Sequence, residues 1–251
     1  MFYKKWFDET KPVLVAGDSY TYGVGHQNTQ LDPFRNPPAS TTWPNYIWHS
    51  NEFNNISHPG CSNGDITQCI YEHWNNNIKV VAVMFSLPNR RDYSYKDYGY
   101  SFSPNNIVSL SNNPLENQMR QEVVKDNKEL FEQFHKMYCM QESDVSNHIN
   151  LLKNIIAIQN LCNSIDCKFF WCAVKPFSMG QERSENPYVN WQISQLEKLI
   201  DITNYFSIDN KSMQEFGESF THNVTTSTGH YTKEVHEIWG QAFSRFINNF
   251  I

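Results

Sequence analysis

The stretch Val13-Leu14-Val15-Ala16-Gly17-Asp18-Ser19 decides the expected fold, because a short apolar run ends abruptly in a glycine and two polar residues. The apolar part is too short for a helix, and its valines favour a buried strand. Two similar runs follow, VVAVMF at 80–85 and KFFWCAV at 168–174. Neither alternates with polar residues, which is typical of parallel strands covered on both faces.

Helical patterns separate these strands. Apolar residues recur at helical spacing in three segments, 66–74, 145–164 and 235–246. Further elements are expected as helices at 115–139 and 190–203, a helix capped by Thr42, and a weak strand at 54–58. Strands that alternate with helices predict βαβ crossovers, and therefore an α/β fold with a mostly parallel sheet.

The chain of 251 residues is expected to form a single domain, 1–251. The stretch at 93–145 matches neither the strand nor the helix pattern of the rest well. Its first part, 93–114, is rich in tyrosine, serine and asparagine and predicts an irregular excursion. We therefore expect an irregular and helical insertion at 93–145.

Composition excludes several classes of function. The chain has 20 Lys+Arg against 26 Asp+Glu, a net charge of −6, so no basic face for nucleic acid is expected. No apolar run approaches the roughly 18–20 residues that cross a bilayer, which predicts no membrane insertion. The six cysteines show no CxxC pair and no zinc-like spacing. They predict buried thiols in a reducing, cytoplasmic compartment and no metal, with a disulfide as the alternative.

Ser19 is the first candidate for catalysis. In parallel sheets ligands bind beyond the carboxyl ends of the strands, where this serine is expected. The alternative is a serine that merely caps or turns the chain. The G-x-S-x-G nucleophile elbow fails at Thr21, and a phosphate-binding loop lacks its lysine. A nucleotide-binding role is therefore disfavoured.

A serine nucleophile needs a base, and His230 is the histidine best placed to supply it. It follows Gly229 and precedes the final amphipathic helix, so it is expected on a loop at a rim of the sheet. His236, on the polar side of that helix, is expected to be solvated or to pack. Gly60 and Asn89 follow the second and third strands and could donate to an oxyanion. Taken singly, each of these residues also has a purely structural interpretation.

In combination, these residues resemble the motifs of the SGNH, or GDSL, hydrolase family. VLVAGDSYTYGVG is similar to the family's first motif, HPGCSNGDI to the second and TGHYTKEVHEIWGQAF to the last. The resemblance implies a three-layer α/β/α fold with a flavodoxin-like sheet. It implies an esterase with Ser19 as nucleophile and His230 as base, and no cofactor. The oxyanion hole would comprise the Ser19 and Gly60 N–H groups and the Asn89 side chain.

The chain departs from the family pattern at the third motif. The family usually has Gly-x-Asn-Asp there, whereas this chain has FSLPNRRDY. Asn89 is the nearest match to the family's asparagine, although Ser86 could lie closer to the site. Arg90 or Arg91 resembles an arginine-containing variant of this motif that is associated with phages.

The second departure concerns the acid of the catalytic triad. The family usually has an aspartate two or three residues before the histidine, where this chain has Thr228 and Ser227. A Ser–His dyad with a backbone carbonyl orienting the imidazole is one possibility, and Asp209 from a neighbouring loop is another. The third is a catalytically impaired protein that serves as a binding module or a structural component of a virion.

The expected substrate is an ester of a small O-acyl or O-acetyl group on a carbohydrate or similar polar molecule. Tyr20, Tyr22, Tyr231 and the segment Tyr93–Tyr100 could line its cleft, or could simply cover the surface. The expected location is cytoplasmic, or virion-associated if a phage encodes the chain.

Overall fold

A computed structural model describes residues 7–24, 26, 38–89, 91–95, 98–102, 133, 143–180, 182–220, 225 and 230–250. The helix expected at 115–139 lies outside these residues, apart from residue 133. Among the described residues, no helix is both long and apolar enough to span a membrane.

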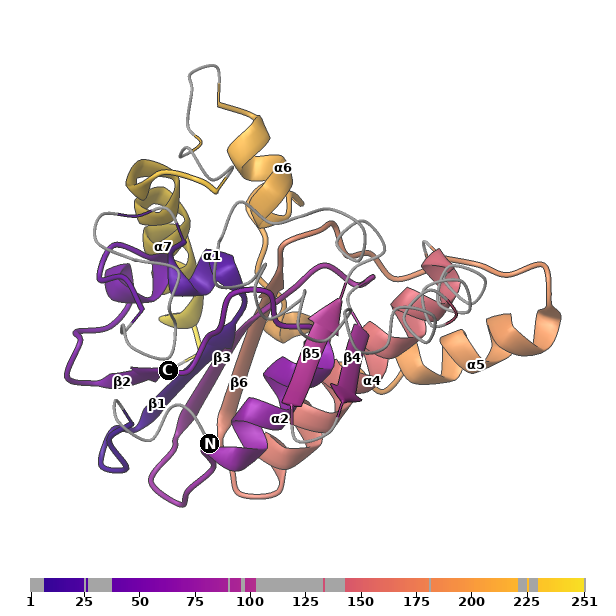
Figure 1. The fold of residues 1–251 in the computed structure, drawn as a ribbon, viewed down its shortest axis with the longest axis horizontal. Helices are drawn as coiled ribbons and strands as arrows, with labels where there is room; N and C mark the ends of the chain where they lie inside the picture. The colour runs from indigo at the N-terminus through magenta and orange to yellow at the C-terminus, as the bar shows by residue number, and fades with distance from the viewer. Residues whose placement is uncertain are drawn as a thin grey trace.

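Four parallel strands form the central sheet in the order β2-β1-β3-β6 (Figure 1). Their bounds are Phe53–Asn55 for β2, Val13–Gly17 for β1, Val80–Phe85 for β3 and Lys168–Ala173 for β6. Val13 pairs with Phe53 on one side and with Val80 on the other, which places β1 inside the sheet. The predicted α/β fold with a parallel sheet is confirmed.

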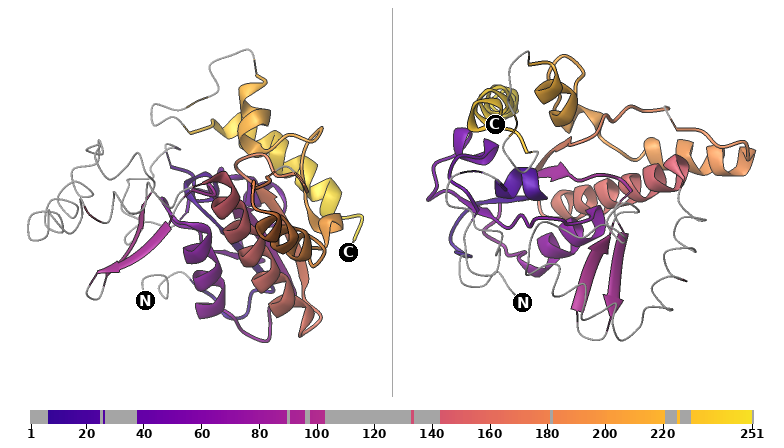
Figure 2. Two further views of the ribbon diagram at one scale, coloured as in Figure 1. Left: turned by 90° about the vertical axis from the view of Figure 1, so that its right-hand side faces the viewer. Right: turned by 45° about the horizontal axis from the view of Figure 1, so that its top comes forward.

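Helices cover both faces of the sheet (Figures 1 and 2). One face carries α2, Asn63–Glu72, with α4, Asp144–Asn163, and α5, Pro187–Glu197. The other face carries α7, Lys233–Ile247, with the 3-10 turn η1, Trp43–Tyr46, and α6, Met213–Glu218. The short helix α1, Ser19–Tyr22, follows β1 directly. The molecule therefore has the expected three layers.

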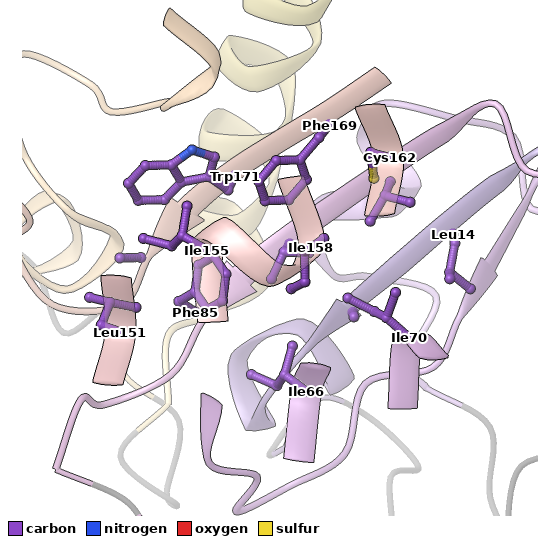
Figure 3. Packing of buried hydrophobic residues seen from close by; sticks show 14 of the residues in the cluster. Leu14, Ile66, Ile70, Phe85, Leu151, Ile155, Ile158, Cys162, Phe169 and Trp171 are labelled. Atoms are coloured by element: carbon purple, nitrogen blue, oxygen red, sulfur yellow. The ribbon is translucent and has the colours of Figure 1, made fainter. Parts of the chain in front are cut away.

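Alternation along each strand divides the apolar side chains between two cores. Leu14 of β1 packs into the core beneath α2 and α4, where it joins Ile66 and Ile155 (Figure 3). Its neighbour Val15 belongs to the core beneath α7. Fully burying a side chain of this size contributes about 1.5–3 kcal/mol. Because the strands contribute side chains to both cores, packing on the two faces holds the sheet, and with it the carboxyl ends of its strands, in place.

The region expected to be irregular begins with a β-hairpin instead. β4, Arg91–Tyr95, pairs antiparallel with β5, Tyr98–Phe102. Aromatic residues alternate with small or polar residues over most of both segments, and aromatic residues favour strands. The expectation of an irregular chain at 93–102 was therefore wrong, because tyrosines that alternate with small or polar residues favour a strand over a loop.

Some local predictions also differ from the structure. Thr42 precedes a 3-10 turn, and its hydroxyl donates to the carbonyl of Ala39 instead of capping. The helix expected to reach residue 203 ends at Glu197, and the 3-10 turn η3, Ile202–Asn204, follows. The unpredicted helix α6 begins with a capping box between Ser212 and Glu215, a signal present in the sequence.

Candidate active site

Ser19 stands at the carboxyl end of the first strand. Asp18 caps the helix α1, and its carboxylate accepts a hydrogen bond from the N–H of Tyr20 at 3.1 Å. A β-carbon at Gly17 would lie 2.2 Å from the Thr21 hydroxyl oxygen, so only glycine allows this close turn. The Gly-Asp-Ser sequence therefore places Ser19 just beyond β1, at the edge where parallel sheets bind ligands.

The structure brings Ser19 and His230 together. Ser19 Oγ lies 2.8 Å from His230 Nε2, although 211 positions separate the two residues. When the hydroxyl donates its proton to Nε2, the other ring nitrogen, Nδ1, carries the hydrogen of the neutral imidazole. This is the ground-state geometry that a serine nucleophile and its general base require.

Aromatic side chains support this pair. The Tyr20 ring lies 5.1 Å from the His230 ring and 5.6 Å from the Tyr231 ring. The Tyr231 hydroxyl donates to the carbonyl of Gln214 in α6 at 2.7 Å. Burial raises the pKa of Tyr231, so its hydroxyl stays protonated and keeps this bond. The segment after His230 is thus anchored on α6.

Only one of the three tyrosines expected near the cleft can offer a broad surface to a ligand. Tyr22 and Tyr231 are both buried, with 1% and 4% of their surfaces exposed, because they pack inside the fold. Tyr20 is partly exposed and lies beside His230. The side chains of Tyr93–Tyr100 fall outside the described ones. The predicted tyrosine-lined cleft is therefore reduced to Tyr20 among the described side chains.

The two predicted oxyanion donors lie in loops that follow strands β2 and β3. Gly60 is exposed, and its φ of 83° is a left-handed conformation that favours glycine. The N–H of His58 donates to the carbonyl of Gly17 at 3.0 Å, which ties this loop to the end of β1. Asn89 is partly exposed in a turn after β3. Their role as donors stays a prediction.

A buried polar network joins the three loops of the carboxyl edge. The Ser86 hydroxyl donates to the Asp18 carboxylate at 2.8 Å, and all but about 1% of Ser86 is buried. The Ser86 N–H donates to Asn63 Oδ1 at 2.7 Å. Asn63 is the first residue of α2, so the network connects the loops after β1, β2 and β3. Ser86 is thus hydrogen-bonded to the loop that carries Ser19, and Asn63 was not predicted.

Two further histidines lie beside the site. His26 was not predicted, and it contacts the backbone of Tyr231. His236 was expected on the polar side of the last helix, but it is completely buried and packs edge-on against His26 at 4.8 Å. Burial, with His26 and His230 nearby, holds the pKa of His236 well below its usual value. The expected packing role fits, and the expected solvation was wrong.

The structure does not bring Asp209 into contact with His230. Asp209 lies in an exposed turn with a φ of 53°, between Ile208 and Lys211, which form an isolated bridge. Among the described residues, its carboxylate makes no hydrogen bond or ion pair. Ser227 and Thr228 lie outside the described residues.

Among the described residues, no group of three or more His, Cys, Asp or Glu side chains could hold a metal ion. Five of the six cysteines lie in the described residues, and no disulfide joins any two of these five. Four of them are buried, namely Cys61, Cys162, Cys167 and Cys172. The prediction of buried thiols is confirmed for these four.

No family model matches the chain, and no curated protein matches its sequence. Among solved structures it is similar to a GDSL-like lipase from Bacteroides thetaiotaomicron, with a TM-score of 0.44, 12% identity, and 97% of this chain and 90% of the lipase covered. It is also similar to an acetylxylan esterase from Geobacillus stearothermophilus, with a TM-score of 0.45, 12% identity, and 96% of each chain covered. A third similar structure is phospholipase A1 from Streptomyces albidoflavus, with a TM-score of 0.39, 12% identity, and 94% of this chain and 98% of the phospholipase covered. At such identities, the roles of single side chains rest on this chain's own geometry.

Proposed function

We propose that this chain is a serine esterase of the SGNH, or GDSL, type that removes a small O-acyl or O-acetyl group from a carbohydrate or similar polar molecule. The observation that carries the proposal is the 2.8 Å contact between Ser19 Oγ and His230 Nε2. A buried serine that donates to an imidazole at the carboxyl edge of a parallel sheet is arranged for nucleophilic attack.

The proposed reaction has two halves. Ser19 Oγ attacks the ester carbonyl carbon while His230 Nε2 takes the hydroxyl proton, and the carbonyl π electrons move onto oxygen. The tetrahedral intermediate collapses, the bond to the alcohol oxygen breaks, and His230 gives its proton to that oxygen. Water, deprotonated by His230, then attacks the acyl-serine. The acid leaves, and the proton returns to Ser19.

The negative oxygen of each intermediate needs donors that are already in place. We propose the N–H groups of Ser19 and Gly60 and the side-chain amide of Asn89 for this task. Removing one such donor typically lowers turnover by about 10²–10³-fold. The network through Ser86 and Asn63 supports the assignment, because it ties the loops that carry these donors to one another.

The orientation of His230 is proposed to come from a group other than Asp209, whose carboxylate makes no hydrogen bond to the imidazole. The two positions where the family has its aspartate carry Ser227 and Thr228. A Ser–His dyad with a backbone carbonyl on Nδ1 supplies the needed tautomer without a carboxylate. Such a dyad is expected to be slower than a complete triad, because an acid also stabilises the imidazolium.

Hydrolysis of p-nitrophenyl acetate tests the proposal. The parent protein is expected to turn over this ester, and Ser19→Ala is expected to lower kcat/KM by at least about 10³-fold. A fluorophosphonate should label the parent at Ser19, as read by peptide mass spectrometry, and should leave Ser19→Ala unlabelled. Equal hydrolysis by parent and Ser19→Ala would remove this serine from the mechanism. A folded parent that neither hydrolyses nor labels would favour a binding module or virion component.

A further inference from the structure

His26 connects the loop of the nucleophile to the segment of the base. Its Nε2 lies 2.9 Å from the carbonyl oxygen of Tyr231, the residue that follows His230. Its Nδ1 lies 2.7 Å from the hydroxyl of Thr41. Only 7% of the His26 surface is exposed, so both contacts are largely shielded from water. A buried imidazole therefore contacts a backbone carbonyl that lies 205 positions further along the chain.

The two partners determine how the ring is protonated. A carbonyl oxygen only accepts, so His26 Nε2 carries the hydrogen and donates to Tyr231. In the neutral ring Nδ1 then accepts from the Thr41 hydroxyl. Burial lowers the pKa of His26 and so favours this neutral form. The ring of His236 packs edge-on against His26 at 4.8 Å.

His26 is also attached to the helix that begins with Ser19. The N–H of His26 donates to the carbonyl of Gly23 at 3.1 Å, and the N–H of Gly23 donates to the carbonyl of Ser19 at 2.9 Å. A closed circuit results, from Ser19 through Gly23 and His26 to Tyr231, then to His230 and back to Ser19 Oγ. The contacts of Tyr231 with α6 hold the same segment from another side but do not reach the nucleophile loop.

We propose that His26 is a positioning residue that keeps the imidazole of His230 in register with the hydroxyl of Ser19. It acts on the backbone beside the base, whereas a triad carboxylate acts on the ring itself. This inference rests on the proposed esterase function. Displacing a reacting group by about 1 Å can cost about 10²-fold in rate, so one backbone anchor is enough to matter.

Steady-state kinetics with p-nitrophenyl acetate test His26. His26→Leu is expected to lower kcat about 10- to 100-fold with KM changed less than about threefold, because His26 is only 7% exposed and is proposed to act on the backbone, not on the substrate. Its fluorophosphonate labelling rate at Ser19 should fall by a similar factor. His26→Gln should recover most of the lost kcat, because the amide can donate to Tyr231 and accept from Thr41.

His73 supplies a matched control. It is also a buried histidine bonded to a backbone carbonyl, that of Cys69 at 2.9 Å, but it directly follows α2, at the end of that helix away from Asn63. His73→Leu is expected to lose stability while its kcat, counted per Ser19 titrated with fluorophosphonate, stays at the parent value. If His26→Leu behaves in the same way, the positioning role is wrong.

The two proposals fail in different ways. If Ser19→Ala is inactive and His26→Leu keeps the parent kcat, the esterase stands and the positioning role falls. If Ser19→Ala remains active, the proposed function itself falls. Should His26→Leu not fold, Thr41→Val replaces it, because this change removes only the partner of Nδ1. A several-fold loss of kcat in Thr41→Val supports the inference, and an unchanged kcat overturns it.

Discussion

The two faces of the central sheet are packed with different kinds of side chains. The helices α2, α4 and α5 contribute mainly aliphatic residues to their core, such as Ile66, Leu151 and Ile155 (Figure 3). The face beneath α7 is rich in aromatic rings, with Phe206 stacked on Phe243 at 4.4 Å. The aromatic face also holds the histidines beside the site. One face therefore mainly stabilises the sheet, and the other both stabilises it and carries His230, the proposed base, which lies three residues before the start of α7.

Large-to-small substitutions in the two cores are expected to have the largest effect on stability. Phe243→Ala is expected to lower the free energy of unfolding by about 4 kcal/mol, because contacts with Phe206 and Trp43 are lost. Ile155→Ala should cost about 3 kcal/mol. Denaturant unfolding measures both effects.

The kinetics of the same two variants distinguish the faces. Phe243→Ala is expected to lower kcat per titrated Ser19 as well, because α7 begins three residues after His230. Ile155→Ala is expected to leave that value unchanged. An equal loss of kcat in both variants would contradict the division of labour between the faces.

Buried histidines make the folded chain sensitive to acid. Burial lowers the pKa of His26 and His236, so these rings are neutral in the folded chain and gain protons near pH 6.5 when it unfolds. Stability is thus fully present above about pH 6.5 and is lost as the pH falls toward the lower folded values. His58, whose pKa burial lowers to about 4, extends the loss to that pH.

The variant His236→Leu tests the contribution of His236 to this acid sensitivity. The variant is expected to reduce the slope of unfolding free energy against pH by about 1.4 kcal/mol per pH unit between pH 6 and 5, because one proton is no longer taken up on unfolding. Urea unfolding at a series of pH values gives this slope. A slope identical to that of the parent would show that His236 does not contribute to acid sensitivity.

The smallest effect is expected outside both cores, at Asp209. Its carboxylate is exposed and makes no hydrogen bond or ion pair among the described residues. Asp209→Asn should therefore change kcat/KM for p-nitrophenyl acetate by less than about twofold, as surface substitutions usually do. A loss of 10²-fold or more would identify Asp209 as the missing acid after all.

Periodicity was enough to predict the sheet, and position together with the resemblance of the motifs predicted that Ser19 and His230 would meet. Buried parallel strands are apolar on both faces, so β1, β3 and β6 stand out in the sequence. Residues that follow such strands must gather at one edge, which explains why the candidate nucleophile could be located. A loop histidine before the last helix completed the pair.

Residues that act through backbone contacts could not be predicted in the same way. His26 bonds a carbonyl 205 positions away, and nothing in its neighbourhood marks this partner. His236 was misplaced because α7 buries a second stripe beside its apolar one. Gly240, four residues on, lies so close to η1 that a β-carbon would meet the carbonyl oxygen of Trp43 at 2.5 Å. The periodicity of apolar residues indicates the apolar stripe of α7, but it does not indicate that the face with His236 and Gly240 is buried as well.

The circuit that links Ser19, His26 and Tyr231 has a consequence for how the protein is made. A ribosome adds His230 211 residues after Ser19, so a nascent chain that ends before His230 carries this serine without its proposed base. β1 must also wait for β3, whose partner residues lie 67 positions further along. Pairings over such distances slow folding. Hydrolytic activity is therefore expected to arise only after translation has passed α7.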